Sequence, residues 1–309
     1  MGATAPLTKG SVPGLPRKTE WPTVAVGLLI YGGFLGATWF WREIPLWLLP
    51  VIGAWLIAWH GSFLHEIIHG HPTPWRALNR ALALPPLALW LPFDIYRADH
   101  IKHHYEPDLT DPREDPETAY VTPAAWARLG RVMRWLLRAN TTLAGRLTVG
   151  PFLSISYFLR SEARRLWAGQ AGRRGIWARH AIAAALVIVW VSVICGMPLW
   201  LYLAAFVYTG AALTSLRSFA EHRFAEDATH RTAIVERAGL FGLLFLHNNL
   251  HVLHHMRQHE PWYRLPALYR AERGALLERN GGLVYAGYGE VARRFLWRAH
   301  DKPVYPSIG

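Results

Sequence analysis

The sequence predicts an all-α integral membrane protein whose transmembrane helices form two hairpins. The chain of 309 residues is 52% hydrophobic, and its apolar residues are gathered into long blocks. Its 33 Lys and Arg residues lie almost entirely outside those blocks. A helix needs roughly 20 mainly apolar residues to cross a bilayer, and basic residues flank such helices. We therefore expect a membrane protein and no nucleic-acid partner, although the net charge is +12.

Four apolar stretches approach the length of a transmembrane helix. They are residues 24–40, 45–63, 180–195 and 198–216. Only a few residues separate the two members of each pair, so each pair is expected to form a tight hairpin. A fifth apolar run, 81–93, is too short to span and is interrupted by Pro85, Pro86 and Pro92. We expect this run to lie at the interface, or to dip into the membrane and return.

The basic residues predict the orientation of the hairpins. Arg42 alone lies in the connections on one side, and the other Lys and Arg residues lie on the opposite side. The positive-inside rule then places both termini and the segment between the hairpins in the cytoplasm. We interpret residues 1–309 as one membrane domain. Its expected parts are a cytoplasmic tail (1–22), two hairpins (24–63 and 180–216) and a cytoplasmic cap (64–179 and 217–309).

The cysteine and histidine contents point to different conclusions. The single cysteine, Cys195, excludes a disulfide framework and any cysteine-based zinc or iron–sulfur site. The 16 histidines are clustered rather than scattered. Because histidine is the commonest metal ligand, the clusters predict a metal site.

Three histidine boxes carry this prediction. The first, with His65 and His69, follows the second apolar stretch, and the two side chains share one face if the helix continues. The other two boxes have the same HxxHH spacing. Their histidines are His100, His103, His104, His251, His254 and His255. Eight imidazoles exceed the capacity of one ion, so two metals are implied.

Two other interpretations of the boxes fit the sequence less well. His65, Glu66 and His69 match the HExxH pattern of zinc proteases, in which the glutamate is the base. A zinc protease, however, leaves both HxxHH boxes without a role. A membrane metal carrier or sensor would place its ligands near the middle of the bilayer, whereas these boxes lie at helix ends.

The order and spacing of the boxes resemble the membrane fatty acid desaturase and hydroxylase superfamily, and its bacterial fatty acid desaturases most closely. The resemblance covers residues 55–268 and includes "HEIIHGHPT", "RADHIKHH", "LRSFAEHR" and "NNLHVLHH". It implies a four-helix membrane stalk under a helical cytoplasmic cap with a di-iron site. It also implies a location in the bacterial cytoplasmic membrane, with the metal site on the cytoplasmic side.

The resemblance implies which residues bind iron, with no catalytic residue beyond the ligands. His222, just beyond the fourth apolar stretch, stands where desaturases have a ninth histidine. The ligand set is then His65, His69, His100, His103, His104, His222, His251, His254 and His255. Ser218 departs from acyl-coenzyme A desaturases, which have asparagine four residues before that histidine, so Asn248 or Asn249 could make the corresponding contact through water.

Several polar residues beside the ligands are candidates to orient the imidazoles through their second nitrogens. These are His71, Glu66, Asp99, Glu221, His247 and Asn248. His71 could also be an additional ligand, but the supporting role is favoured. The acidic stretch 108–117 lacks EF-hand spacing, so we interpret it as a structural loop or a surface that docks the electron donor.

The expected activity is oxygen-dependent desaturation of a fatty acyl or other lipid-like substrate. The cofactors would be two iron ions that alternate between Fe²⁺ and Fe³⁺, with O₂ as co-substrate. Since the chain has no fused redox motif, the electrons would come from a separate protein of the ferredoxin, rubredoxin or cytochrome b5 type. The alternative is a di-iron hydroxylase or ketolase that acts on a carotenoid, an alkane or a small amphiphile. Membrane lipids are the other expected partners.

Overall fold

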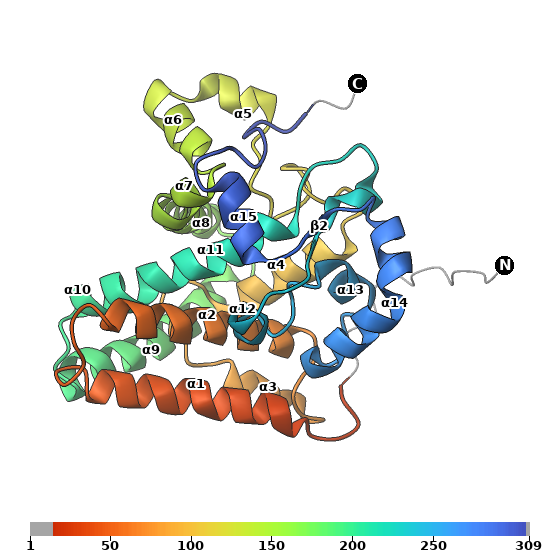
Figure 1. The fold of residues 1–309 in the computed structure, drawn as a ribbon. Helices are drawn as coiled ribbons and strands as arrows, with labels where there is room; N and C mark the ends of the chain where they lie inside the picture. Colours follow the sequence, from red (N-terminus) through yellow and green to blue (C-terminus); the bar gives the residue numbers. More distant parts are fainter. Residues whose placement is uncertain (1–14, 307–309) are drawn as a thin grey trace.

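The computed structural model describes residues 15–306, which form a mostly helical protein with very little strand (Figure 1). This confirms the all-α prediction. Most of the predicted tail, 1–22, lies outside the described residues. In the described part, α1 begins at Trp21, with Pro22 in its first turn, where proline costs the helix no hydrogen bond.

The structure contains four helices that are long and apolar enough to cross a membrane. The first two are α1 (Trp21–Trp39) and α2 (Leu49–Ile68). The third joins α9 (Arg173–Ile188) to the π-helical η1 (Val189–Ile194). The fourth joins α10 (Leu199–Tyr202), the π-helical η2 (Leu203–Tyr208) and α11 (Thr209–Glu221). The third begins earlier and the fourth ends later than the apolar stretches suggest, because polar residues that contact the cap extend both helices.

The second helix, α2, is the centre of the stalk. In its most apolar stretch of 18 residues, 72% of the residues are buried, against 22% to 33% in the corresponding stretches of the other three helices. It packs most extensively against the fourth span, where glycines allow close approach. A Cβ at Gly53 would lie 2.2 Å from the Ala205 carbonyl oxygen, and one at Gly210 would lie 2.3 Å from Ile57 Cβ. Small residues commonly let membrane helices pack this closely.

The connections of the two hairpins contact each other at the end of the stalk farthest from the cap (Figure 1). Trp41 Nε1 and Arg42 Nη1 donate hydrogen bonds to the Cys195 carbonyl oxygen, at 3.0 and 3.2 Å. Gly196 has a φ of +61° and accepts a hydrogen bond from Arg42 Nη2 at 3.3 Å. The basic residue on this side therefore caps the C-terminus of the third span, since helix C-termini have unsatisfied carbonyls.

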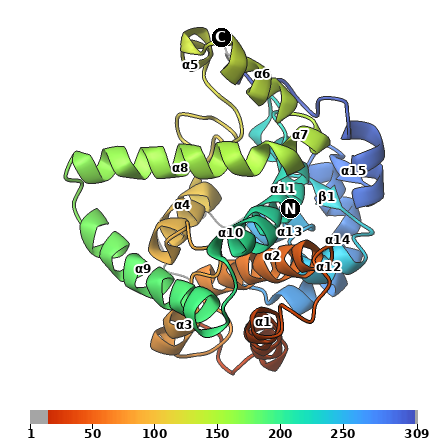
Figure 2. The ribbon, with the colours of Figure 1, turned by 90° about the vertical axis from the view of Figure 1, so that its left-hand side faces the viewer.

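Four further helices lie between the two hairpins in the sequence. They are α5 (Pro123–Arg128), α6 (Arg131–Ala139), α7 (Leu143–Thr148) and α8 (Gly150–Trp167). The side chains of Thr122 and Thr142 cap α5 and α7 by accepting hydrogen bonds from backbone N–H groups. Figures 1 and 2 together show α8 lying across the spans. Trp135 and Trp167 are largely exposed, and contact of this region with lipid headgroups stays a prediction.

The remaining elements form the rest of the cap. The helices are α3 (Arg76–Leu82), α4 (Phe93–Tyr105), α12 (Leu240–Leu244), α13 (His251–Met256), α14 (Leu265–Arg279) and α15 (Tyr288–Phe295). Two 3₁₀ turns are η3 (Ala228–Arg231) and η4 (Trp262–Arg264). The strands β1 (Ile234–Val235) and β2 (Val284–Tyr285) pair in parallel, with Ile234 opposite Val284.

The fifth apolar run does not form a spanning helix. It contains the end of α3 and an irregular segment that leads into α4. Side chains of the spans bind its carbonyl groups: Tyr202 donates to Leu87, and the His180 Nε2 atom lies 2.8 Å from the Leu89 oxygen. Irregular backbone at membrane depth needs such partners, because lipid offers no hydrogen bonds.

Candidate metal centre

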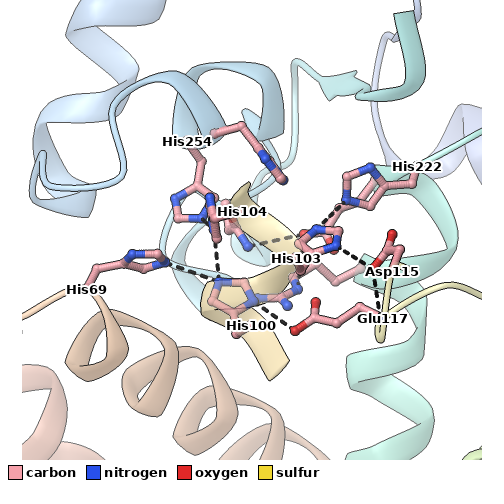
Figure 3. A network of polar contacts seen from close by, with 12 residues as sticks. His69, His100, His103, His104, Asp115, Glu117, His222 and His254 are labelled. Carbon is pink, nitrogen blue, oxygen red and sulfur yellow. Dashed lines mark hydrogen bonds and ion pairs between the residues drawn. The ribbon is translucent and has the colours of Figure 1, made fainter. Parts of the chain in front are cut away.

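The three histidine boxes meet where the spans join the cap. The first lies at the end of α2, the second on α4 and the third on α13, while His222 follows the last residue of α11. Because each box lies on a helix or at its end, its side chains have fixed directions. The structure brings all nine expected ligands together (Figure 3).

The nine side chains form two groups, and within each group the potential ligand atoms lie within 4.8 Å of one another. The first group comprises His65, His69, His100, His104 and His254. The second group comprises His103, His222, His251 and His255. Each group offers enough imidazole nitrogens to hold one transition-metal ion.

Helical geometry divides each HxxHH box between the groups. On α4, His100 and His104 share a face and join the first group, whereas His103 faces the second. On α13 the assignment is reversed: His254 joins the first group, whereas His251 and His255 join the second. The rings of His104 and His255 stack with their centroids 4.3 Å apart. Each HxxHH box therefore serves both groups, which ties them into one centre.

Four of the expected ligands have a hydrogen-bond acceptor beside their Nδ1 atom. Glu117 Oε1 lies 2.8 Å from His100 Nδ1, and Asp115 Oδ1 lies 2.8 Å from His103 Nδ1 (Figure 3). Two further acceptors are the Asn248 side-chain oxygen, 3.1 Å from His251 Nδ1, and the Arg231 carbonyl oxygen, 3.2 Å from His222 Nδ1. These contacts place the proton on Nδ1 and leave the Nε2 lone pair pointing inward.

The inward nitrogens fit a bound cation. His222 Nε2 lies 2.9 Å from His251 Nε2 and 3.1 Å from His103 Nε2. Because the Nδ1 atoms of these three rings face acceptors, the facing Nε2 atoms of the neutral rings carry lone pairs and would repel each other. In the first group, His65 Nε2 is buried without a hydrogen-bond partner. A metal ion between the rings satisfies these atoms, so the residues fit the expected metals.

The electrostatics of the centre favour neutral imidazoles at most of the ligands, and His103 is the exception. Burial and neighbouring histidines hold the pKa of His104, His254 and His255 well below the usual range. Burial also lowers the pKa of His103, but Glu117 and Asp115 outweigh it and raise that pKa. Burial opposes ionisation of Glu117, yet His100 and His103 hold its pKa well below the usual value. An ionised carboxylate on Nδ1 makes an imidazole a stronger metal ligand.

Three of the expected supporting residues lie close to ligands. Glu221 Oε1 is 3.4 Å from His251 Nδ1 and accepts a hydrogen bond from Asn248 Nδ2 at 3.2 Å. It also pairs with Arg217 Nε at 3.1 Å. Glu66 Oε1 is 3.7 Å from His65 Nδ1, which is too far for a hydrogen bond.

The structure places the other three expected supporting residues outside both groups. His71 Nδ1 lies 2.7 Å from a Glu20 carboxylate oxygen, and His247 packs against Trp262 with ring centroids 5.8 Å apart. Asp99 precedes His100 on α4 and interacts electrostatically with arginines of α8 and α9. Adjacent helical residues point in different directions, so a position beside a ligand did not guarantee contact. Ser218 is exposed and bonds to the Ser215 carbonyl, away from the centre.

Sequence reasoning did not identify Asp115 and Glu117 as partners of the ligands. It interpreted stretch 108–117 as a loop or docking surface, and the structure shows that this loop folds back onto α4. The available signal was a run of carboxylates that directly follows an HxxHH box. The buried Arg217 was also missed, since it lies at the polar end of an apolar stretch.

Comparison with known proteins adds one match. The sequence model of the family described as "Fatty acid desaturase" matches residues 44–287, which include all nine clustered histidines. No curated protein sequence matches the chain.

Proposed function

The chain belongs to the fatty acid desaturase family, and from this premise we propose that it is a di-iron desaturase that introduces a double bond into a fatty acyl substrate. The family is iron-dependent, which makes the chain an oxidoreductase. The observation that carries the proposal is the pair of histidine groups with inward-facing nitrogens. Imidazole groups bind iron as well as zinc, copper and nickel, and two adjacent groups suit two ions; membership of the iron-dependent family favours iron.

Each group would hold one iron through the nitrogens described above. Two bound iron ions would activate O₂, which is the oxidant, so that hydrogen can be removed from an unactivated methylene. The chain's own residues hold and orient the ligands: Asp115, Glu117 and Asn248 fix imidazole rings through Nδ1. Burial of most of these ligands excludes water, which would otherwise compete at the reacting centre.

An apolar cavity beside the third and fourth spans supports a lipid-like substrate. The cavity is about 430 Å³ and lies between α8, α9, η2 and the irregular segment before α4. Its walls include Leu89, Trp90, Leu159, Trp177 and Val207. Pockets lined by aliphatic and aromatic side chains suit hydrocarbon chains. We propose that part of an acyl chain occupies this cavity.

The proposal includes an orientation and an electron source. The cap and the centre lie at the same end of the spans (Figure 1), and the basic residues are concentrated at that end. We therefore place the centre on the cytoplasmic side. A soluble ferredoxin, rubredoxin or cytochrome b5-type protein would deliver electrons there.

The test combines metal analysis with product analysis. Purified protein is expected to contain two iron ions per chain, and cells that express it are expected to gain an acyl double bond. Protein with the His103→Ala substitution is the matched control. One zinc ion per chain and no iron would contradict the proposal. A hydroxylated or keto product would instead support the hydroxylase or ketolase alternative.

A further inference from the structure

A second cavity lies outside the metal centre, at the C-terminal end of α15. Its volume is about 680 Å³, and its lining combines Arg223 with the chain from Ala292 to His300. Four of the lining residues are arginines: Arg223, Arg293, Arg294 and Arg298. Four guanidinium groups around one concave surface create a strong positive potential.

Acidic side chains do not neutralise this potential. Glu290 pairs with Arg294 at 3.1 Å. Asp301 accepts a hydrogen bond from Tyr120. Within residues 15–306, no carboxylate forms an ion pair with the other three arginines of the cavity. The cavity therefore has positive charge available for an anionic ligand.

The lowered pKa of His300, in the wall of the cavity, is consistent with the positive charge of the arginines. Its ring is buried against Phe219 and Phe295, with centroids 4.9 and 4.8 Å away. Burial, and then the nearby Arg223, lower the pKa of His300 to about 4. A neutral imidazole at this position adds no charge of its own, and its Nε2 atom lies 2.8 Å from the Tyr285 hydroxyl.

The cavity lies beside α7, one of the four helices between the two hairpins. Backbone hydrogen bonds join its chain to the α7 region: Ala144 N donates to the Leu296 oxygen at 3.0 Å, and His300 N donates to the Thr141 oxygen at 2.8 Å. Figure 1 shows α15 next to α7 and α8. Trp297 at the rim is 81% exposed. Exposed tryptophan beside arginine is typical of the membrane–water interface.

We propose that this cavity binds the phosphate-bearing headgroup of an anionic phospholipid. Guanidinium groups bind phosphate oxygens through paired, charge-assisted hydrogen bonds. The position beside α7 favours a lipid of the surrounding bilayer over a soluble phosphate compound, and Trp297 would lie among the acyl chains next to the headgroup. The site is separate from the acyl cavity at α8 and α9, so the inference does not depend on the proposed reaction.

The experiment measures lipid retention by native mass spectrometry. The protein is placed in nanodiscs that contain equal amounts of phosphatidylglycerol and phosphatidylcholine. It is then released from the nanodiscs, and the lipids that remain bound to it are counted. The test variant is Arg293→Gln/Arg298→Gln. The control is Arg270→Gln/Arg279→Gln, which changes the net charge equally at exposed positions on α14. Wild type and control are expected to retain phosphatidylglycerol selectively. The test variant is expected to bind it about 30-fold more weakly, as for two basic residues lost at an anionic surface.

Further measurements separate the alternatives. Arg298→Lys keeps the charge but removes the paired geometry, so it should weaken retention by less than the double substitution does. Equal iron content and thermal midpoints in the two double variants would show that both are folded. Equal phosphatidylglycerol retention by both, or equal retention of the two lipids by the wild type, would overturn the proposal. Displacement of the lipid by millimolar inorganic phosphate would overturn it in favour of a soluble ligand.

Discussion

The two histidine groups contain similar side chains but differ in how these are held. In the second group, acceptors bind the Nδ1 atoms of three of the four rings. In the first group, His100 has a close acceptor, but the Nδ1 atoms of His69 and His104 are buried without a partner among the described residues. The first group instead has five rings, on three helical elements.

The difference teaches that a metal site can be organised in two ways. Hydrogen bonds to the outer nitrogens fix ring orientation in the second group, so its geometry is prepared before a metal binds. The first group relies on its larger number of rings and on the packing of α2, α4 and α13. We therefore expect the second group to be more sensitive to changes in the surrounding residues.

The largest effect is expected from loss of a ligand. His222→Ala should remove the metal of the second group, and His254→Ala should weaken the first, because each imidazole is a proposed ligand. Turnover should fall by on the order of 10³-fold or more in either variant. Iron per chain, measured by elemental mass spectrometry, should fall toward one in His222→Ala. Full activity in either variant would exclude that residue as a ligand.

A large effect on stability is expected from Arg217. Its partner Glu221 is buried next to His251. Arg217→Met leaves the carboxylate unpaired, which should destabilise the protein by about 3–5 kcal/mol. Thermal unfolding in detergent measures the change. Adding Glu221→Gln should restore much of the lost stability, and a double variant no more stable than Arg217→Met would contradict this pairing.

A smaller effect is expected from the carboxylates on Nδ1. Asp115→Asn should weaken iron binding by the second group about 10- to 100-fold, because the amide is a poorer acceptor than the carboxylate. Chelator competition measures the affinity. Glu117→Gln is the matched change in the first group and should have the weaker effect. If the two substitutions have equal effects, the proposed difference between the groups is wrong.

The smallest effect is expected at Ser218. Its side chain is exposed and directed away from the centre. Ser218→Ala should change stability by less than about 0.5 kcal/mol and leave iron content unaltered. Asn248→Ala provides the contrast, since Asn248 touches both His251 and Glu221. A loss of iron in Ser218→Ala would show that this residue acts on the centre.

The sequence predicted the fold class and the gathering of the nine histidines. Apolar blocks next to basic flanks predicted four spanning helices, and the structure has four helices that are long and apolar enough to cross a membrane. The identical spacing of the second and third boxes predicted a centre for two metals. Local periodicity fixes which residues share a helix face, so this information is present in the chain itself.

Only the tertiary structure decided how these residues are combined. In each HxxHH box it placed the middle histidine, His103 or His254, in one group and the other two histidines in the other group. This happens because the two helices approach the centre from different sides. It also brought Asp115 and Glu117 back onto α4, while Asp99, the immediate neighbour of a ligand, forms no hydrogen bond or ion pair with a ligand within residues 15–306. Contacts between distant segments depend on how the chain packs, and spacing along the sequence does not encode that directly.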